Sequence, residues 1–103
     1  MKKVKITVVK KIIIEDLLKE YGAAGLGICT LHEEGQEYIC SGGGWQKPDG
    51  LCDNAWKSMM EYAMALAHGG KNFYGGKWLN DENMAIISCN DGLRPVIFKV
   101  EAM

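Results

Sequence analysis

The sequence has little arginine, little proline and no long run of apolar residues. Arg94 is the one arginine among 12 basic residues, which face 13 acidic ones and leave a formal net charge of −1. Proteins that bind nucleic acid usually carry a basic excess and clusters of arginine, so nucleic acid is not expected as a partner. Because no apolar stretch approaches about 20 residues, no membrane partner or membrane span is expected either.

The beginning of the chain is charged rather than apolar. Lys2 and Lys3 resemble the start of a signal peptide, but Lys10 and Lys11 interrupt the apolar stretch that such a signal needs. Without an export signal we expect a cytoplasmic protein, in a compartment that keeps thiols reduced. The four cysteines are therefore interpreted as free thiols or metal ligands rather than as disulfides.

Length and composition predict one domain over residues 1–103. Hydrophobic residues make up 48% of the chain, and three Trp, four Tyr and two Phe supply bulky core material. A chain of this size buries enough surface to fold around a single core without disulfides.

Two periodicities place the secondary structure. Residues 3–9 alternate apolar and polar, as in a half-buried strand, whereas Ile14, Leu17 and Tyr21 recur at helical spacing before Gly22. Strands are expected at residues 3–9, 36–40, 84–90 and 96–101, and helices at residues 13–21 and 51–68. The order β-α-β-α-β-β predicts an α+β domain, with a mainly antiparallel open sheet and one long and one short helix packed on one face.

The long helix, residues 51–68, is apolar on two faces. Asp49 is its expected N-cap, and Gly69 follows its expected end. Such a helix is either central in the fold or shared with a partner subunit. A structural or interaction module that forms a homo-oligomer through this helix is therefore one functional alternative. The methionines of this helix are interpreted first as core residues and second as an adaptable binding surface.

Cysteines are the residues most suggestive of chemistry. Cys29, Cys52 and Cys89 all lie at the ends of expected elements, where scaffolds display functional groups, whereas Cys40 lies in a strand and is expected to pack. No Cys-x-x-Cys pair is present. Three cysteines that converge from separate elements could hold zinc or an iron–sulfur cluster. Metal binding by these three residues is our leading hypothesis, with His32, Asp53 or Asp91 as a possible fourth ligand.

Cys52 is also the best candidate for a catalytic thiolate. The N-terminus of the long helix favours a negative charge there, while Asp49 and Asp53 oppose it. A bound cation would remove this conflict. A small thiol-dependent redox enzyme that uses Cys52 is the second alternative, and whether the protein is an enzyme stays open.

Arg94 and the two histidines have simpler interpretations. Arg94 is a candidate cofactor-binding residue because a guanidinium can clamp a carboxylate or phosphate, but an ion pair with Asp91 is the plainer expectation. His68 is expected to interact with the C-terminal end of the long helix, and His32 to lie on a surface loop.

Three segments resemble a family of small bacterial and archaeal proteins of unknown function. They are residues 25–38, residues 49–56, and Cys89-Asn-Asp-Gly-Leu-Arg-Pro-Val96, the most specific of the three. With the first strand, the resemblance covers nearly the whole chain. It implies a stand-alone prokaryotic cytoplasmic protein, without an assigned activity or known catalytic residues. The family resembles this chain at Cys29, Cys52 and Cys89 more than at Cys40, and this chain departs from the pattern at residues 42–45.

Overall fold

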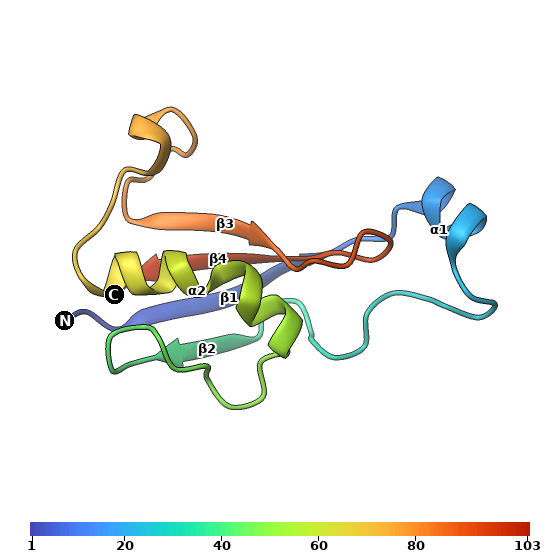
Figure 1. Ribbon diagram of the computed structural model, residues 1–103, viewed down its shortest axis with the longest axis horizontal. Helices are drawn as coiled ribbons and strands as arrows, with labels where there is room; N and C mark the ends of the chain where they lie inside the picture. Colours follow the sequence, from blue (N-terminus) through green and yellow to red (C-terminus); the bar gives the residue numbers. More distant parts are fainter.

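The computed structural model describes residues 1–103, and an antiparallel four-stranded sheet forms its centre (Figure 1). The strand order is β2-β1-β4-β3. The strands are β1 (Val4–Lys11), β2 (Glu37–Cys40), β3 (Met84–Ser88) and β4 (Val96–Ala102), and the helices are α1 (Glu15–Tyr21), α2 (Asp53–Ala67) and the short 3-10 helix η1 (Phe73–Gly76). The predicted α+β class and the order β-α-β-α-β-β are confirmed. None of the helices is long and apolar enough to cross a membrane.

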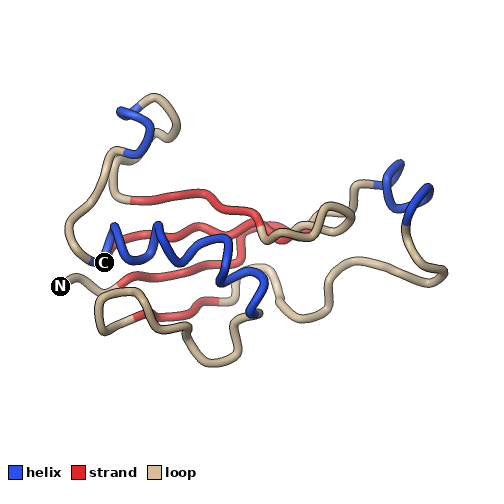
Figure 2. The backbone as a smooth tube through the Cα atoms, in the orientation of Figure 1, coloured by secondary structure: helices blue, strands red, loops and turns tan.

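The core lies between α2 and one face of the sheet. The alternation in β1 sends Val4, Ile6 and Val8 to this face, where all three are fully buried. Phe98 of β4 and Met59 of α2 are also fully buried. Figure 2 shows α2 lying over one face of the sheet, whose opposite face no helix covers. The burial of apolar side chains between α2 and this one face of the sheet therefore holds the domain together.

α2 begins later than predicted. Cys52 is its N-cap and Asp53 its first residue, so the prediction of Asp49 as the N-cap is wrong. Asp49 lies exposed in a turn, and Lys47 closes that turn by binding the Leu51 carbonyl oxygen at 2.6 Å and the Asp53 carboxylate at 2.9 Å. This lysine holds the start of the helix in place of a capping side chain.

The C-terminal end of α2 agrees with its prediction. His68 is the C-cap, and its Nδ1 lies 2.8 Å from the carbonyl oxygen of Met64 in the last turn, which also accepts the His68 backbone N–H at 3.2 Å. Along the helix, Met59 is a core residue as expected, whereas Met64 is 37% exposed. The outer face of α2 is mainly polar, with Lys57 and Glu61 exposed.

The short helix α1 does not share the core. It contains no buried residue, and its N-cap residue Ile14 makes no side-chain capping bond. The chain carries α1 away from the sheet on an extension beyond β1 (Figures 1 and 2). Of the two helices expected on one face of the sheet, only α2 packs there.

The glycine-rich turn after β2 packs closely against α2 at Gly44. Gly44 has a φ of +73°, and a Cβ at this position would lie 2.5 Å from the Ala63 carbonyl oxygen. Gly42 has a similar φ of +70°, but a Cβ there would meet nothing within 4 Å. The turn therefore needs glycine at position 44 for both its conformation and its approach to α2.

We predict that Gly44→Ala destabilises the protein more than Gly42→Ala does. Both substitutions force alanine into a left-handed conformation, at a cost of about 1–2 kcal/mol. Only Gly44→Ala adds a clash with the α2 backbone, and overpacking of this kind costs about 1–3 kcal/mol more. Urea unfolding of the two variants measures the difference, and equal free energies of unfolding would contradict the packing described for Gly44.

Candidate functional site

Three of the four cysteines line one pocket at the N-terminal end of α2. Cys29 comes from the loop after α1, Cys52 is the N-cap of α2, and Cys89 directly follows β3. The pocket has a volume of about 100 Å³ and is also lined by Leu31, Asn54, Asn90, Asp91 and Arg94. The structure thus brings the predicted cysteines Cys29, Cys52 and Cys89 to one place, together with Arg94.

The β3–β4 ladder fixes the position of Cys89. Its backbone N–H donates to the Val96 carbonyl oxygen at 2.9 Å, one step beyond the last paired residues of the two strands. In return, the Val96 N–H donates to the Cys89 sulfur at 3.3 Å. Two hydrogen bonds therefore hold this thiol at the pocket wall on a rigid element.

Cys52 is held by a buried histidine. His32 is only 2% exposed, so the prediction of a surface loop histidine is wrong. Its Nε2 accepts the Cys52 backbone N–H at 3.4 Å, which assigns the proton to Nδ1, and Nδ1 donates to the Tyr38 hydroxyl at 3.0 Å. Burial lowers the pKa of His32, because the charged imidazolium would lose its hydration. His32 is therefore a neutral imidazole that holds Cys52 in position. It does not itself line the pocket.

Cys29 arrives on a loop that is tied to β1. The Lys11 Nζ donates to the Cys29 carbonyl oxygen at 3.0 Å, and the Lys11 backbone N–H donates to the Glu34 carboxylate at 3.1 Å. The Gly35 N–H also donates to the Val8 carbonyl oxygen at 2.7 Å. These contacts hold the loop near the sheet, and Cys29 is only 9% exposed.

Asp91 and Arg94 form the polar wall of the pocket. The Asp91 carboxylate accepts the backbone N–H groups of Leu93 at 2.9 Å and Arg94 at 3.2 Å, and the Arg94 Nε at 3.0 Å. These bonds, with the Leu93 N–H foremost, lower the pKa of Asp91. The predicted Asp91–Arg94 ion pair is confirmed. Because Asp91 binds only the Nε, the two terminal nitrogens of Arg94 stay free to hold an anion.

Cys40 lies outside this pocket and packs in the core, as predicted. It is 1% exposed, and its thiol donates to the Gln46 carbonyl oxygen at 3.2 Å. Burial raises the pKa of Cys40, which disfavours the thiolate that metals and electrophiles require.

No group of three or more His, Cys, Asp or Glu side chains is arranged so that it could hold a metal ion. Among the predicted fourth ligands, Asp91 lines the pocket but is occupied by Arg94, while His32 and Asp53 do not line it. Lys47 binds the exposed Asp53 carboxylate and lowers its pKa. The lining residues Asn54 and Asn90 are not among the predicted site residues, although their closeness in sequence to Cys52 and Cys89 is a usable signal.

Comparison with protein-family models, curated proteins and solved structures finds no match. The resemblance proposed from the sequence therefore stays a prediction, and the pocket is interpreted from its own residues.

We predict that His32 makes stability depend on pH below its ordinary pKa of 6.5. The unfolded chain takes up a proton there while the folded imidazole stays neutral, so the free energy of unfolding falls as the pH drops from 6.5 toward the lowered folded pKa. One proton limits the slope to about 1.4 kcal/mol per pH unit. In urea unfolding between pH 7 and pH 5, His32→Asn should reduce this slope, and the exposed-site control His68→Asn should keep it. An unchanged slope in His32→Asn would contradict the assignment.

Proposed function

We propose that this protein binds a soft metal ion through Cys29, Cys52 and Cys89. The observation that supports the proposal is that these thiols, from three separate elements, line one small pocket, while Cys40 packs elsewhere. Thiolates are preferred ligands of zinc and other soft metals.

The charges around the pocket suit three thiolates. Three thiolates and one divalent ion carry a net charge of −1. The Asp91 carboxylate already balances the charge of Arg94, but the two terminal nitrogens of Arg94 can still donate hydrogen bonds to anionic groups in the pocket. The unpaired N–H groups of the first turn of α2 add a partial positive charge at Cys52. Both features favour the deprotonated sulfurs that a metal requires.

The pocket fits a single ion better than an iron–sulfur cluster. Iron–sulfur clusters are most often held by four cysteines, and the fourth cysteine of this chain, Cys40, is buried outside the pocket. Since the three thiols are not arranged as a ligand group in the free chain, metal binding must draw the sulfurs together. Rotation about χ1 of each cysteine, between its staggered positions, moves the sulfur without moving the backbone.

We predict that Cd²⁺ or Zn²⁺ binds to the reduced protein with one ion per chain and releases protons. Competition with a chromophoric chelator measures the affinity, and the ultraviolet band of cadmium–thiolate bonds reports sulfur ligation. Cys52→Ser should weaken binding by at least about tenfold, since a ligand is lost. The matched control Cys40→Ser should bind as the wild type does.

Two results would count against metal binding. One is the absence of a cadmium–thiolate band in the wild-type protein. The other is an equal effect of Cys40→Ser and Cys52→Ser, which would show that the pocket is not the site.

Thiol–disulfide exchange is the second candidate function. It is favoured by the position of Cys52 at the N-terminus of α2, which favours a thiolate, in one pocket with the further thiols of Cys29 and Cys89. In this reaction the Cys52 thiolate attacks a low-molecular-weight disulfide and displaces one thiolate. A second pocket thiolate then displaces the other, so that the small disulfide is reduced to two thiols and the protein gains one disulfide. Titration with glutathione disulfide, followed by mass spectrometry, would detect an internal disulfide that includes Cys52; a mixed disulfide alone would argue against the reaction.

A further inference from the structure

We propose that residues 12–28, here called the arm, dock on the uncovered sheet face of a second copy of this chain. The arm contains α1 and the segments on either side of it. No other element of the chain packs over the apolar residues of the arm. The sheet likewise has one face that no helix covers, and this face is partly apolar. The two surfaces complement each other in polarity and in charge.

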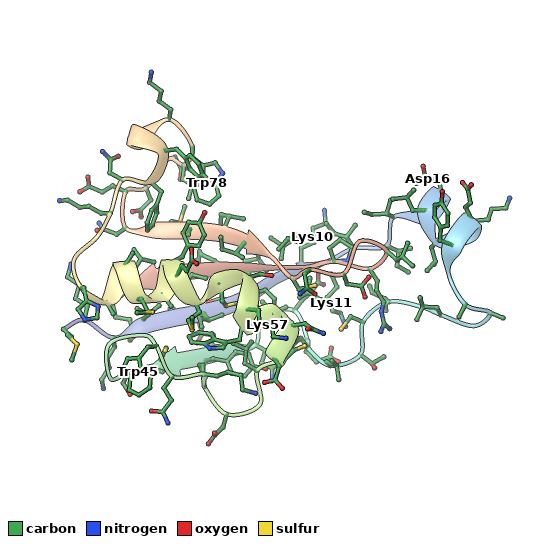
Figure 3. All side chains as sticks on the ribbon, in the orientation of Figure 1. Lys10, Lys11, Asp16, Trp45, Lys57 and Trp78 are labelled. Carbon is green, nitrogen blue, oxygen red and sulfur yellow. The ribbon has the colours of Figure 1, made fainter.

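The arm carries apolar side chains on both sides of its charged residues, and it is unburied along its whole length. None of its residues is buried. Tyr21 is 70% exposed, Ile28 41% and Leu17 38%. Its apolar side chains are Ile12, Ile13, Ile14, Leu17, Leu18, Tyr21, Leu26 and Ile28, apart from the two alanines at positions 23 and 24. In Figure 3 the arm, marked by Asp16, extends to one end of the molecule, away from α2 and β3.

A helix as short as α1 needs packing to be stable. It has seven residues, no side-chain cap and no buried residue. Isolated helices shorter than about 12–15 residues are marginal in water, because few hydrogen bonds compensate for nucleation. Within one copy of the chain the apolar stripe of Ile14, Leu17 and Tyr21 is only partly covered, because Ile14 is half-buried while Leu17 and Tyr21 are exposed. A surface outside the chain is therefore needed to stabilise α1.

The uncovered face of the sheet offers such a surface. Residues paired across antiparallel strands share a face, so Lys5 lies on the same face as Ile39 and Glu101. The residues of this face are Lys5, Thr7, Lys10, Glu37, Ile39, Met84, Ile86, Ser88, Ile97, Lys99 and Glu101. None of them is buried, and Ile39 is 46% exposed.

The charges of the two surfaces are opposite. In the arm, Glu15, Asp16 and Glu20 against the single Lys19 give a net charge of −2. On the sheet face, three lysines against two glutamates give +1. Lys5 binds Glu37 and Lys99 binds Glu101, which leaves Lys10 as the lysine without an ion-pair partner. An acidic arm and a face with a free lysine attract each other, which favours this pairing over arm against arm.

A second copy of the chain is the partner that covers both the arm and the uncovered sheet face at once. When two copies exchange arms reciprocally, the two contacts are identical and the assembly closes as a symmetric dimer. The arm reaches along the longest axis of the molecule, which measures 45 Å against 20 Å for the shortest. This extension carries the arm beyond its own sheet face and toward a neighbour.

Light scattering coupled to size exclusion tests the proposal on the full chain. The wild-type protein should have twice the mass of one chain. Leu17→Lys in the arm and Ile86→Lys on the sheet face should each raise the dimer dissociation constant at least about tenfold by placing a charge in the contact. Met64→Lys on the outer face of α2 is the matched control, since Met64 is 37% exposed and Leu17 38%. It should leave the dimer intact.

Each other outcome overturns the proposal in a defined way. A wild-type monomer up to millimolar concentration excludes the dimer. Loss of the dimer in Met64→Lys alone would place the interface on α2, the alternative predicted from the sequence. Loss in Leu17→Lys with an intact dimer in Ile86→Lys would mean that arms pair with arms or with another surface.

Hydrogen exchange gives an independent measurement that does not depend on a variant. The amides of α1 should be protected at high protein concentration and lose protection on dilution, while those of α2 stay protected. Circular dichroism should show that the three variants keep the wild-type fold, because each substituted residue lies outside the buried core. Concentration-independent exchange in α1 would overturn the proposal.

Discussion

The packing of α2 on one face of the sheet is the contact on which the other features depend. Met59 and Leu66 of the helix and Phe98 of β4 are fully buried there, so the helix cannot shift without exposing core surface. Its N-terminus is thereby held beside the end of β3. The same contact thus builds the core and brings Cys52 near Cys89, which makes the pocket a consequence of the fold rather than an addition to it.

The three pocket thiols differ in how firmly the fold holds them. Cys89 is fixed by the β3–β4 ladder, and Cys52 by the helix start and the His32 side chain. Cys29 lies on a long loop that is tied to β1 by the Lys11 Nζ contact, by the Glu34 contact and by two backbone hydrogen bonds with Val8. Local stability follows the number of buried contacts and hydrogen bonds, so the Cys29 loop should move first. If a ligand requires shorter distances between the three sulfurs, Cys29 is the residue that would move most to provide them.

The sequence predicted the elements well because their periodicities arise from a single core face. Val4, Ile6 and Val8 alternate as their burial requires, and Asp91-Gly92 marks the turn between β3 and β4. The helix cap was misplaced because the contacts of one side chain, that of Lys47 with the Leu51 carbonyl oxygen and the Asp53 carboxylate, decide where α2 begins, and no periodicity of the sequence marks these contacts. His32 was misplaced for the same reason. Its burial depends on Tyr38 and Phe98, and no local pattern marks these partners.

The convergence of the cysteines was a hypothesis that their spacing in the sequence could not decide, since it depends on how the loop after α1 returns to β1.

That loop also links the two proposals. The arm, residues 12–28, runs directly into Cys29 and His32, which reach the pocket and the start of α2. Fixing the arm on a partner would restrict the loop and reduce the entropy that Cys29 loses when a ligand binds. By thermodynamic linkage, a ligand held by Cys29 would favour the dimer by the same factor as the dimer favours the ligand. The arm is therefore the element through which assembly and the thiol pocket would be coupled.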